Sequence, residues 1–311
     1  MTPRASVVIA AYGGAGVIGD QLRVLAEQEA APAFEVLVMD NNSPDDLAGT
    51  VGPFLSDAVR LVPARGGQGQ CYARNLGALL ARGEHVLLCG QDDVVGPRWV
   101  ASLVAELDRA RVLATGPMEV SELNKEDVWR VYLGDPDASP LLRPFPVQGY
   151  LPFAFGCNLG IRRDDFLALR GMDNSYRGGD EDTDFSWRAQ EAGLPLVVAD
   201  GAVVHYRLRA EAKALFRQRQ GYARTRMLPA VRSKGVRELR GMSLRWTITS
   251  LLRAPLAWVR SRSTTAGRFR WAMETGSLVG NLEGQIRYRV LRPPEPELVD
   301  RARSEAEQRA N

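Results

Sequence analysis

Two clusters of acidic residues have the types and spacing that catalysis would need. Gly90-Gln91-Asp92-Asp93 ends the apolar run His85–Cys89, and Asp180–Asp184 follows a Gly-Gly pair at the start of a helix-like stretch. Carboxylates at a strand end and at a helix start can converge on one pocket. One can then hold a divalent metal on a phosphate while another removes a proton from a nucleophile. Sugar transfer from a nucleotide donor requires this division of labour.

The elements that would position these carboxylates alternate between strand and helix, which predicts an open α/β sheet. Continuous apolar runs are typical of parallel strands covered on both faces. The predicted strands are residues 5–11, 34–39, 59–62, 85–89, 111–117, 158–162, 195–199 and 202–205, and the predicted helices are 16–30, 70–81, 97–109 and 181–192. Ligands of such sheets bind at the carboxyl ends of the strands, where Asp40 and Asp92 lie.

Other segments are less regular. Residues 118–150 are rich in proline and are expected to form an irregular substrate-side loop. Residues 207–233 are expected to form an arginine-rich helix that leads away from the active site. The tail after Pro293 is interpreted as a frayed helix or a disordered end.

A competing motif lies near the N-terminus. Gly14-x-Gly16-x-x-Gly19 stands between a predicted strand and a predicted helix, and Asp40 follows Gly19 by 21 residues. This is the local pattern of a dinucleotide-binding fold, in which the glycines admit a pyrophosphate and the acid binds a ribose. An NAD(P)-dependent oxidoreductase is therefore a second hypothesis, although the motif explains none of the later carboxylates.

The composition is that of an ordinary globular protein, with 45% hydrophobic and 25% charged residues in a chain of 311. The net charge of +3 is unevenly spread, since residues 1–206 carry −11 and residues 207–311 carry +14. The three cysteines lack metal-site spacing and are interpreted as reduced thiols of a cytosolic protein. No signal peptide is recognised, and no apolar run reaches the roughly 18 residues that span a bilayer.

Residues 5–206 resemble the family 2 glycosyltransferases, which have the GT-A fold. Each matching block is moderately specific, and their common order carries the resemblance. The blocks are Ser6–Tyr12, Glu35–Ser43, Ala73–Gly77 with Ala81–Glu84, Gly171–Asp173 with Gly179–Arg188, and Ala199–His205. The resemblance implies a Rossmann-like, mostly parallel sheet flanked by helices, and an inverting, metal-dependent transfer from a nucleotide sugar.

One departure affects the expected metal site. The Asp-x-Asp motif of the family begins where this chain has Gly90, so its first aspartate is missing and Asp92 takes the place of the second. Either Gln91 or Asp93 is a candidate to compensate. The missing aspartate also raises a third hypothesis, a catalytically silent relative that binds a sugar nucleotide.

The resemblance assigns roles to particular residues. Asp182 would be the general base, and Asp92 and His205 would bind Mg²⁺ or Mn²⁺. The donor nucleotide would contact Ala11, Tyr12, Asp40, Arg74, Gln91 and Asp92, and the acceptor side would hold Glu181, Asp184 and Trp187. Simpler interpretations stay open: Asp40 as a helix cap, acids that complement a helix dipole, a packed histidine and an exposed Arg74.

Residues 207–311 are predicted to be a separate helical extension of the catalytic domain 1–206. Its segments 243–260 and 268–291 mix tryptophan and leucine with arginine. They fit an anionic membrane surface, as in lipid-linked acceptor chemistry, or a cover or homo-oligomer contact. Nucleic-acid binding is disfavoured because no recognised module accompanies the charge.

The prediction is a cytoplasmic or membrane-peripheral glycosyltransferase of surface glycan or glycolipid assembly, at the inner face of the cell membrane when peripheral. Its donor would carry UDP, dTDP or GDP and its acceptor a hydroxyl group.

Overall fold

A seven-stranded sheet forms the centre of the computed structural model, which describes the whole chain except residues 1, 136, 147–149, 233–243 and 311. The strand order is β10 (Leu196–Val198), β6 (Leu113–Thr115), β9 (Asn158–Arg162), β4 (His85–Cys89), β1 (Ala5–Ala11), β2 (Phe34–Asp40) and β3 (Val59–Pro63). All neighbours pair in parallel except β9, which runs antiparallel to β4 and β6. The predicted open, mostly parallel α/β sheet is confirmed.

Side-chain alternation along β1 explains why its apolar run is continuous. Val7 and Ile9 belong to one buried cluster and Val8 to the other, on the opposite face of the sheet. The first cluster is completed by α1 (Ile18–Ala26), α2 (Leu47–Val51) and α4 (Trp99–Arg109), and the second by α3 (Gln70–Leu80), α6 (Arg163–Ala168) and α7 (Glu181–Glu191). A strand covered on both faces has no solvent side to carry polar residues.

A smaller sheet follows the carboxyl end of β4. Its order is β5 (Val94–Val95), β11 (Val204–His205), β7 (Met118–Glu119) and β8 (Leu141–Leu142). The expectation of an irregular segment at 118–150 is wrong for much of its described part, because β7, α5 (Glu126–Leu133) and β8 lie there. Two acids in the first turn and a left-handed Gly134 at the end define α5. Pro136 lies outside the described residues.

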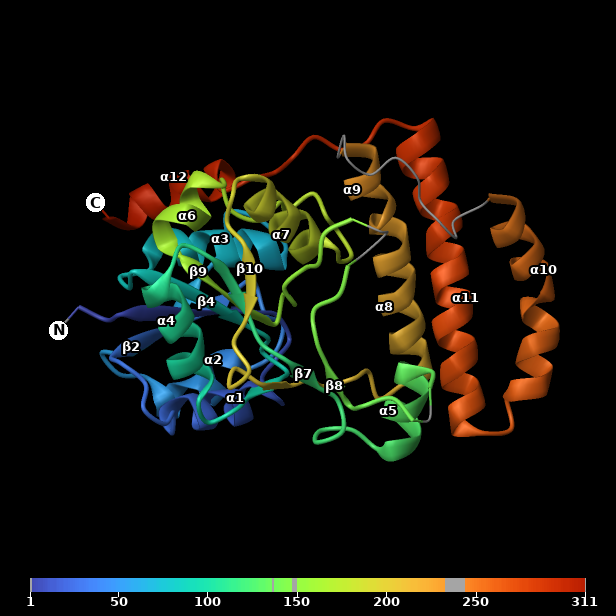
Figure 1. Cartoon of the computed structure of the whole chain (residues 1–311), viewed down its shortest axis with the longest axis horizontal. Helices are drawn as coiled ribbons and strands as arrows, with labels where there is room; N and C mark the ends of the chain where they lie inside the picture. The colour runs from blue at the N-terminus through green and yellow to red at the C-terminus, as the bar shows by residue number, and fades with distance from the viewer. Residues whose placement is uncertain (1, 136, 147–149, 233–243, 311) are drawn as a thin grey trace.

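Three long helices form a layer at the side of the molecule (Figure 1). They are α8 (Ala212–Thr225), α11 (Thr265–Gln285) and α10 (Leu244–Ser261), with the short α9 (Met227–Arg232) after α8 and η2 (Ile286–Val290) after α11. Gly276, Gly280 and Gly284 of α11 lie against the backbone of α8, and a Cβ at any of them would meet a carbonyl oxygen there. Such small residues let two helices approach closely.

The last helix, α12 (Asp300–Ala310), returns to the catalytic part of the chain and packs on α3. Glu305 accepts hydrogen bonds from the Tyr72 hydroxyl and from the Gly66 amide. The tail is therefore a docked helix, and the division of the chain at residue 206 stays a prediction. Among the described helices, none is long and apolar enough to cross a bilayer.

Candidate active site

The first acidic cluster is tied to the ends of two other strands. The Gln91 side-chain amide exchanges two hydrogen bonds with the backbone of Tyr12, at 3.0 and 2.9 Å, just after β1. Asp92 Oδ2 accepts a hydrogen bond from Arg209 at 2.9 Å, and the Asp92 carbonyl accepts one from Arg207 Nε at 2.8 Å. The loop after β4 thus joins the end of β1 to the segment after β11.

Asp93 occupies the space left by the missing aspartate. A Cβ at Gly90 would overlap Asp93 Oδ2 and would lie 3.4 Å from Asp92 Oδ1. Asp93 is only 2% exposed, and its Oδ1 accepts a hydrogen bond from the Arg207 amide at 2.9 Å. Burial and the neighbouring Asp92 raise the pKa of Asp93 to about 8. The Asp93 carboxylate therefore fills the space that a side chain at residue 90 would take, and its compensation for the missing aspartate stays a prediction.

The second acidic cluster begins α7 and is held by backbone amides. Gly179 and Asp180 both have positive φ angles, 123° and 64°, which turn the chain into the helix. Asp182 Oδ2 accepts a hydrogen bond from the Gly156 amide at 2.9 Å, and its Oδ1 accepts one from the Thr183 amide at 2.8 Å. Burial raises the pKa of Asp182, and it raises that of Asp180 to about 6.

Glu181 and Arg74 form a buried pair beside Asp182. Arg74 is 5% exposed, its NH1 lies 3.4 Å from Glu181 Oε1, and its NH2 donates to the Gly156 carbonyl at 2.9 Å. The Gln70 amide donates to the same Glu181 oxygen. Arg74 Nε and Glu181 Oε2 are buried without a partner, and burial together with Asp182 raises the pKa of Glu181 to about 7. The alternative of an exposed Arg74 is wrong, and unpaired buried atoms of this kind are typical of a binding site.

The two clusters converge on the same surroundings. Cys89 at the end of β4 pairs with Asn158 of β9, and the Gly156 amide just before β9 donates to Asp182. Burial, then Asp93 and Asp182, raise the pKa of the intervening Cys157 thiol. Tyr206 and Tyr222 each accept a hydrogen bond from Gln218, at 3.4 and 3.2 Å. Burial raises the pKa of both tyrosines, with a further contribution from Asp93 for Tyr206 and from Asp182 for Tyr222. Tyr206 and Tyr222 are therefore linked to each other through Gln218.

The remaining donor-side residues lie at the same edge of the sheet. Ala11 and Asp40 are paired neighbours at the ends of β1 and β2. Asp40 Oδ1 accepts a hydrogen bond from the Ser43 amide at 2.8 Å, whereas the cap of α2 is Asp46. Asn41, which the sequence did not single out, holds the glycine-rich loop through the carbonyls of Ala64 and Gly67 and the amide of Gly69.

The predicted acceptor-side residues have structural partners. Trp187 is buried, and its Nε1 donates to the Leu151 carbonyl at 2.9 Å. Asp184 accepts hydrogen bonds from Arg188 at 2.9 Å and from the Tyr176 hydroxyl at 3.1 Å. Both side chains are therefore already hydrogen-bonded within the protein. They would influence acceptor binding by positioning the segments that they contact, not by touching the acceptor.

The residues around Asp92 suit one kind of divalent-cation site and not another. His205 lies opposite Val94 on the next strand, and its Nδ1 is 3.2 Å from Glu119. Within the described ranges, no three His, Cys, Asp or Glu side chains gather as a metal cage. Mg²⁺ sites that serve nucleotides use one or two carboxylates plus the phosphates of the ligand. The adjacent carboxylates of Asp92 and Asp93 fit this second kind of site.

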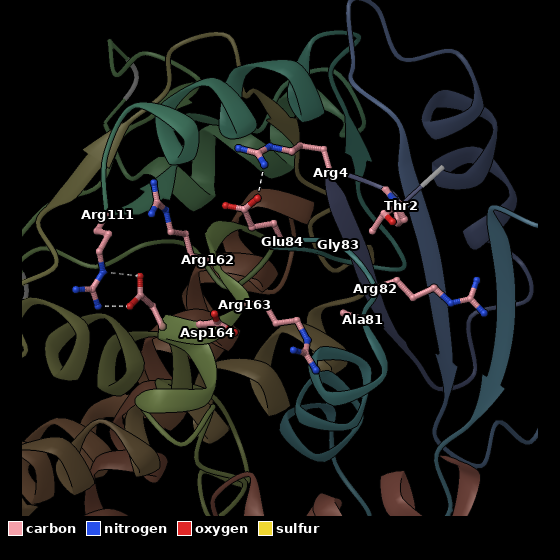
Figure 2. Close-up of a pocket in the computed structure, with 12 residues that line it drawn as sticks. Thr2, Arg4, Ala81, Arg82, Gly83, Glu84, Arg111, Arg162, Arg163 and Asp164 are labelled. Atoms are coloured by element: carbon pink, nitrogen blue, oxygen red, sulfur yellow. Dashed lines mark hydrogen bonds and ion pairs between the residues drawn. The ribbon is translucent and has the colours of Figure 1, made fainter. Parts of the chain in front are cut away.

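A hollow of about 680 Å³ lies at the opposite end of the sheet. Residues at the starts of β1 and β4 line this hollow. Figure 2 shows Arg4 paired with Glu84 there. Arg111 is likewise paired with Asp165. Because much of its charge is neutralised internally and the acidic clusters lie at the other strand ends, this hollow is separate from the candidate active site.

The segment from residue 207 borders the site rather than leading away from it, which corrects the sequence prediction. Arg209 binds Asp92, and Thr225 and Arg226 of the same segment contact Asp180 at 3.2 and 3.8 Å. The physical reason is the close contact of Gly221 and Tyr222 of α8 with Gly178 and Gly179, just before α7. Arg209 and Tyr222 were missed because an arginine-rich pattern does not say which arginines meet carboxylates.

The comparisons with known proteins agree with this geometry. The family model described as Glycosyl transferase family 2 matches residues 6–169, more than half of the chain, and a model described as the N-terminal domain of galactosyltransferase matches residues 142–210. The succinoglycan biosynthesis protein ExoO of Rhizobium meliloti is 31% identical over 108 residues, which are 35% of this chain and 31% of that protein. The match therefore spans about a third of that relative's length.

Two solved structures share the fold. The mannosyltransferase PcManGT from Pyrobaculum calidifontis, in complex with GDP-Man and Mn²⁺, superposes with a TM-score of 0.60 at 19% identity, over 92% of this chain and 87% of that chain. Staphylococcus aureus TarS gives a TM-score of 0.50 at 16% identity, over 88% and 55%. The GT-A fold is confirmed, and the transferase hypothesis is favoured over the dinucleotide one. The chain belongs to glycosyl transferase family 2 and is a glycosyltransferase.

Proposed function

We propose that this enzyme transfers a sugar from a nucleoside diphosphate donor to a hydroxyl acceptor with inversion, and that Asp182 is the general base. The observation that carries the proposal is the buried acidic turn at the start of α7. There Asp182 has a raised pKa, and the neighbouring Glu181 Oε2 has no partner. The loop with Asp92 follows β4, whose last residue Cys89 pairs with Asn158, and the nearby Gly156 amide donates to Asp182; this adjacency supports placing donor and acceptor groups around one centre.

Asp182 is positioned to take the acceptor proton. Amides of Gly156 and Thr183 fix its two oxygens, so the carboxylate is oriented before the acceptor binds. A raised pKa makes its ionised form a stronger base than an exposed aspartate, which suits removal of a proton from a hydroxyl as it attacks the anomeric carbon. The neighbouring Arg74 stabilises negative charge in the same region.

The donor nucleotide is placed at the ends of β1, β2 and β4. Asp40 lies where a base or ribose would contact the sheet edge, and Gln91 holds the Tyr12 backbone. Arg209, which is paired with Asp92, is the proposed partner of the diphosphate. An arginine fork suits phosphate oxygens.

Mg²⁺ or Mn²⁺ is the proposed cofactor, held by Asp92 and Asp93, with His205 as a further candidate. When bound, such a cation neutralises the leaving diphosphate. The Mn²⁺ bound by the mannosyltransferase of the same fold supports this part of the proposal. The pairing of Asp92 with Arg209 implies that a cation competes with the guanidinium for that carboxylate.

The relatives suggest a glycan product. ExoO is named for succinoglycan biosynthesis, and a glycan of the cell surface is the proposed destination of the transferred sugar. The nucleotide of the donor would be UDP, dTDP or GDP. A GDP-sugar has the added support of the GDP-Man complex.

A thermal-shift panel tests donor binding and metal use together. The chain is melted with UDP, dTDP and GDP, each with Mn²⁺ and with EDTA, and with NAD(P). A ligand at a hundred times its Kd stabilises by about 2.7 kcal/mol, which raises Tm by roughly 5 °C. One nucleoside diphosphate should do so, and EDTA should reduce the shift.

Two aspartate variants show whether the Mn²⁺-dependent thermal shift arises at the proposed site. Asp92→Asn should lose the Mn²⁺-dependent part of the shift, whereas Asp57→Asn, an exposed aspartate ahead of β3, should keep it. A shift with the dinucleotide alone would contradict the transferase proposal. An equal shift with Mn²⁺ and with EDTA would contradict the metal part only.

A further inference from the structure

Helix α10 presents an apolar stripe to solvent. Ile248, Leu252, Leu256 and Val259 are exposed, and their spacing of four, four and three residues places them on one face of the helix. Leu252 is 77% exposed and Leu256 is 55% exposed. An exposed row of large aliphatic side chains on one helix is a mark of an interaction surface.

The opposite face of α10 is fixed against α11. The rings of Trp258 and Trp271 pack with their centroids 4.9 Å apart, and Trp271 Nε1 donates to the Ala254 carbonyl at 2.9 Å. Figure 1 shows α10 as the outermost helix of its layer, on the side away from the sheet. The stripe therefore cannot turn into the core without breaking these contacts.

The charge around the stripe has one sign. From Glu238 to Glu274 the sequence has seven arginines and no acidic residue between those two glutamates. Arg253 and Arg260 lie on α10 itself and are exposed. A second copy of the chain would bring the same positive charge against this face, whereas an anionic surface would complement it.

We propose that α10 docks on the interface of an anionic lipid bilayer, with Leu252 and Leu256 inserted among the acyl chains and Arg253 and Arg260 at the phosphate level. An amphipathic helix with an apolar face beside basic residues lies in the plane of such an interface. Helix α10 itself contains no acidic residue, so none of its own side chains repels the lipid phosphates. This inference needs no sugar transfer and stands apart from the proposed chemistry.

Vesicle flotation of the full chain tests the proposal. Vesicles of phosphatidylcholine are compared with vesicles that contain about one-third phosphatidylglycerol, which supplies the negative surface. The chain should float with the anionic vesicles, and added salt should release part of it because ionic attraction is screened.

Two pairs of substitutions separate the apolar and ionic contributions. Leu252→Ser with Leu256→Ser should lower the partition coefficient by roughly a hundredfold, about tenfold for each leucine. Arg253→Gln with Arg260→Gln should lower it by roughly twenty-fivefold, about fivefold for each charge. The matched controls are Leu55→Ser, 50% exposed on the catalytic part, and the exposed Arg98→Gln, and both should bind as the parent chain does.

Three results would overturn the proposal. One is a parent chain that stays unbound with anionic vesicles. Another is a leucine pair that binds as the parent does. The third is a parent dimer that the leucine pair converts to a monomer without any change in vesicle binding, since the stripe would then be covered by a second copy. Because the substituted side chains are exposed, unchanged melting curves should show that the variants are folded.

Discussion

Replacement of Asp182 by asparagine separates catalysis from folding. The substitution keeps the size of the side chain and removes its ability to accept a proton. Loss of a positioned general base typically slows the chemical step by about 10²- to 10⁴-fold. At about 1.4 kcal/mol for each factor of ten, this corresponds to roughly 3 to 5 kcal/mol in the activation barrier.

The cost to stability should be smaller, because two effects oppose each other. The carboxylate oxygens accept hydrogen bonds from the Gly156 and Thr183 amides. An asparagine can accept only one of these, and a lost buried hydrogen bond costs about 1 to 3 kcal/mol. The substitution also removes a buried negative charge that raises the pKa of Glu181 and of Asp180. We therefore expect a net change in unfolding free energy within about 2 kcal/mol.

The assay is release of nucleoside diphosphate in the presence of an acceptor, measured as kcat, with donor affinity measured separately by calorimetry. Asp165→Asn is the matched control, since Asp165 is also a buried aspartate but lies beside Arg111 at the other end of the sheet. The control should lose stability and keep kcat. A kcat for Asp182→Asn within threefold of the parent, with chemistry rate-limiting, would refute the assignment of the base.

Three further substitutions test the site and its support. Glu181→Gln should remove the titration of Glu181 from the pH dependence of stability. Because the pKa of Glu181 is raised from 4.5 to about 7, the folded chain holds that proton while the unfolded chain releases it. As the pH rises from 4.5 to about 7, the unfolding free energy should therefore fall by up to about 1.4 kcal/mol per pH unit. Denaturant titrations of the Glu181→Gln variant should lack this slope. Gly90→Ala should destabilise by about 1 to 3 kcal/mol in thermal melts, since its Cβ overlaps the buried Asp93 carboxylate; an unchanged Tm would contradict the packing. Gly280→Ala should cost a similar amount by pushing α11 away from the Gln220 carbonyl, whereas Gly52→Ala, which has open space, should cost less.

Local pattern was sufficient for the central sheet. The runs at β1 and β4 are apolar except at Ser6 and His85 because each strand is covered on both faces, and this signal needs no knowledge of partners. Acids that follow such strands could be placed at one edge by topology alone. Helix α5 was not predicted because the prolines that follow it indicate an irregular segment, whereas its own amphipathic stretch is short and ends at Gly134.

Contacts between distant segments could not be predicted in the same way. Arg209 pairs with Asp92 across 117 residues, and nothing in the spacing of the basic residues distinguishes it from its neighbours. The placement of α8 beside the site depends on the contact of Gly221 with Gly178, and neither glycine shows in the sequence which residue it meets. The role of Tyr222 follows only from that placement.

Gly90, Asp93 and Arg209 are best understood as one linked arrangement. A carboxylate at residue 90 would add negative charge beside Asp92 and would overlap the buried Asp93 carboxyl group, whose pKa is already raised to about 8 by burial and by Asp92. Glycine avoids that repulsion and leaves room for Asp93, while the Arg209 guanidinium neutralises Asp92 at 2.9 Å. We therefore propose that the missing aspartate is compensated within the site and that its absence does not mark a silent relative.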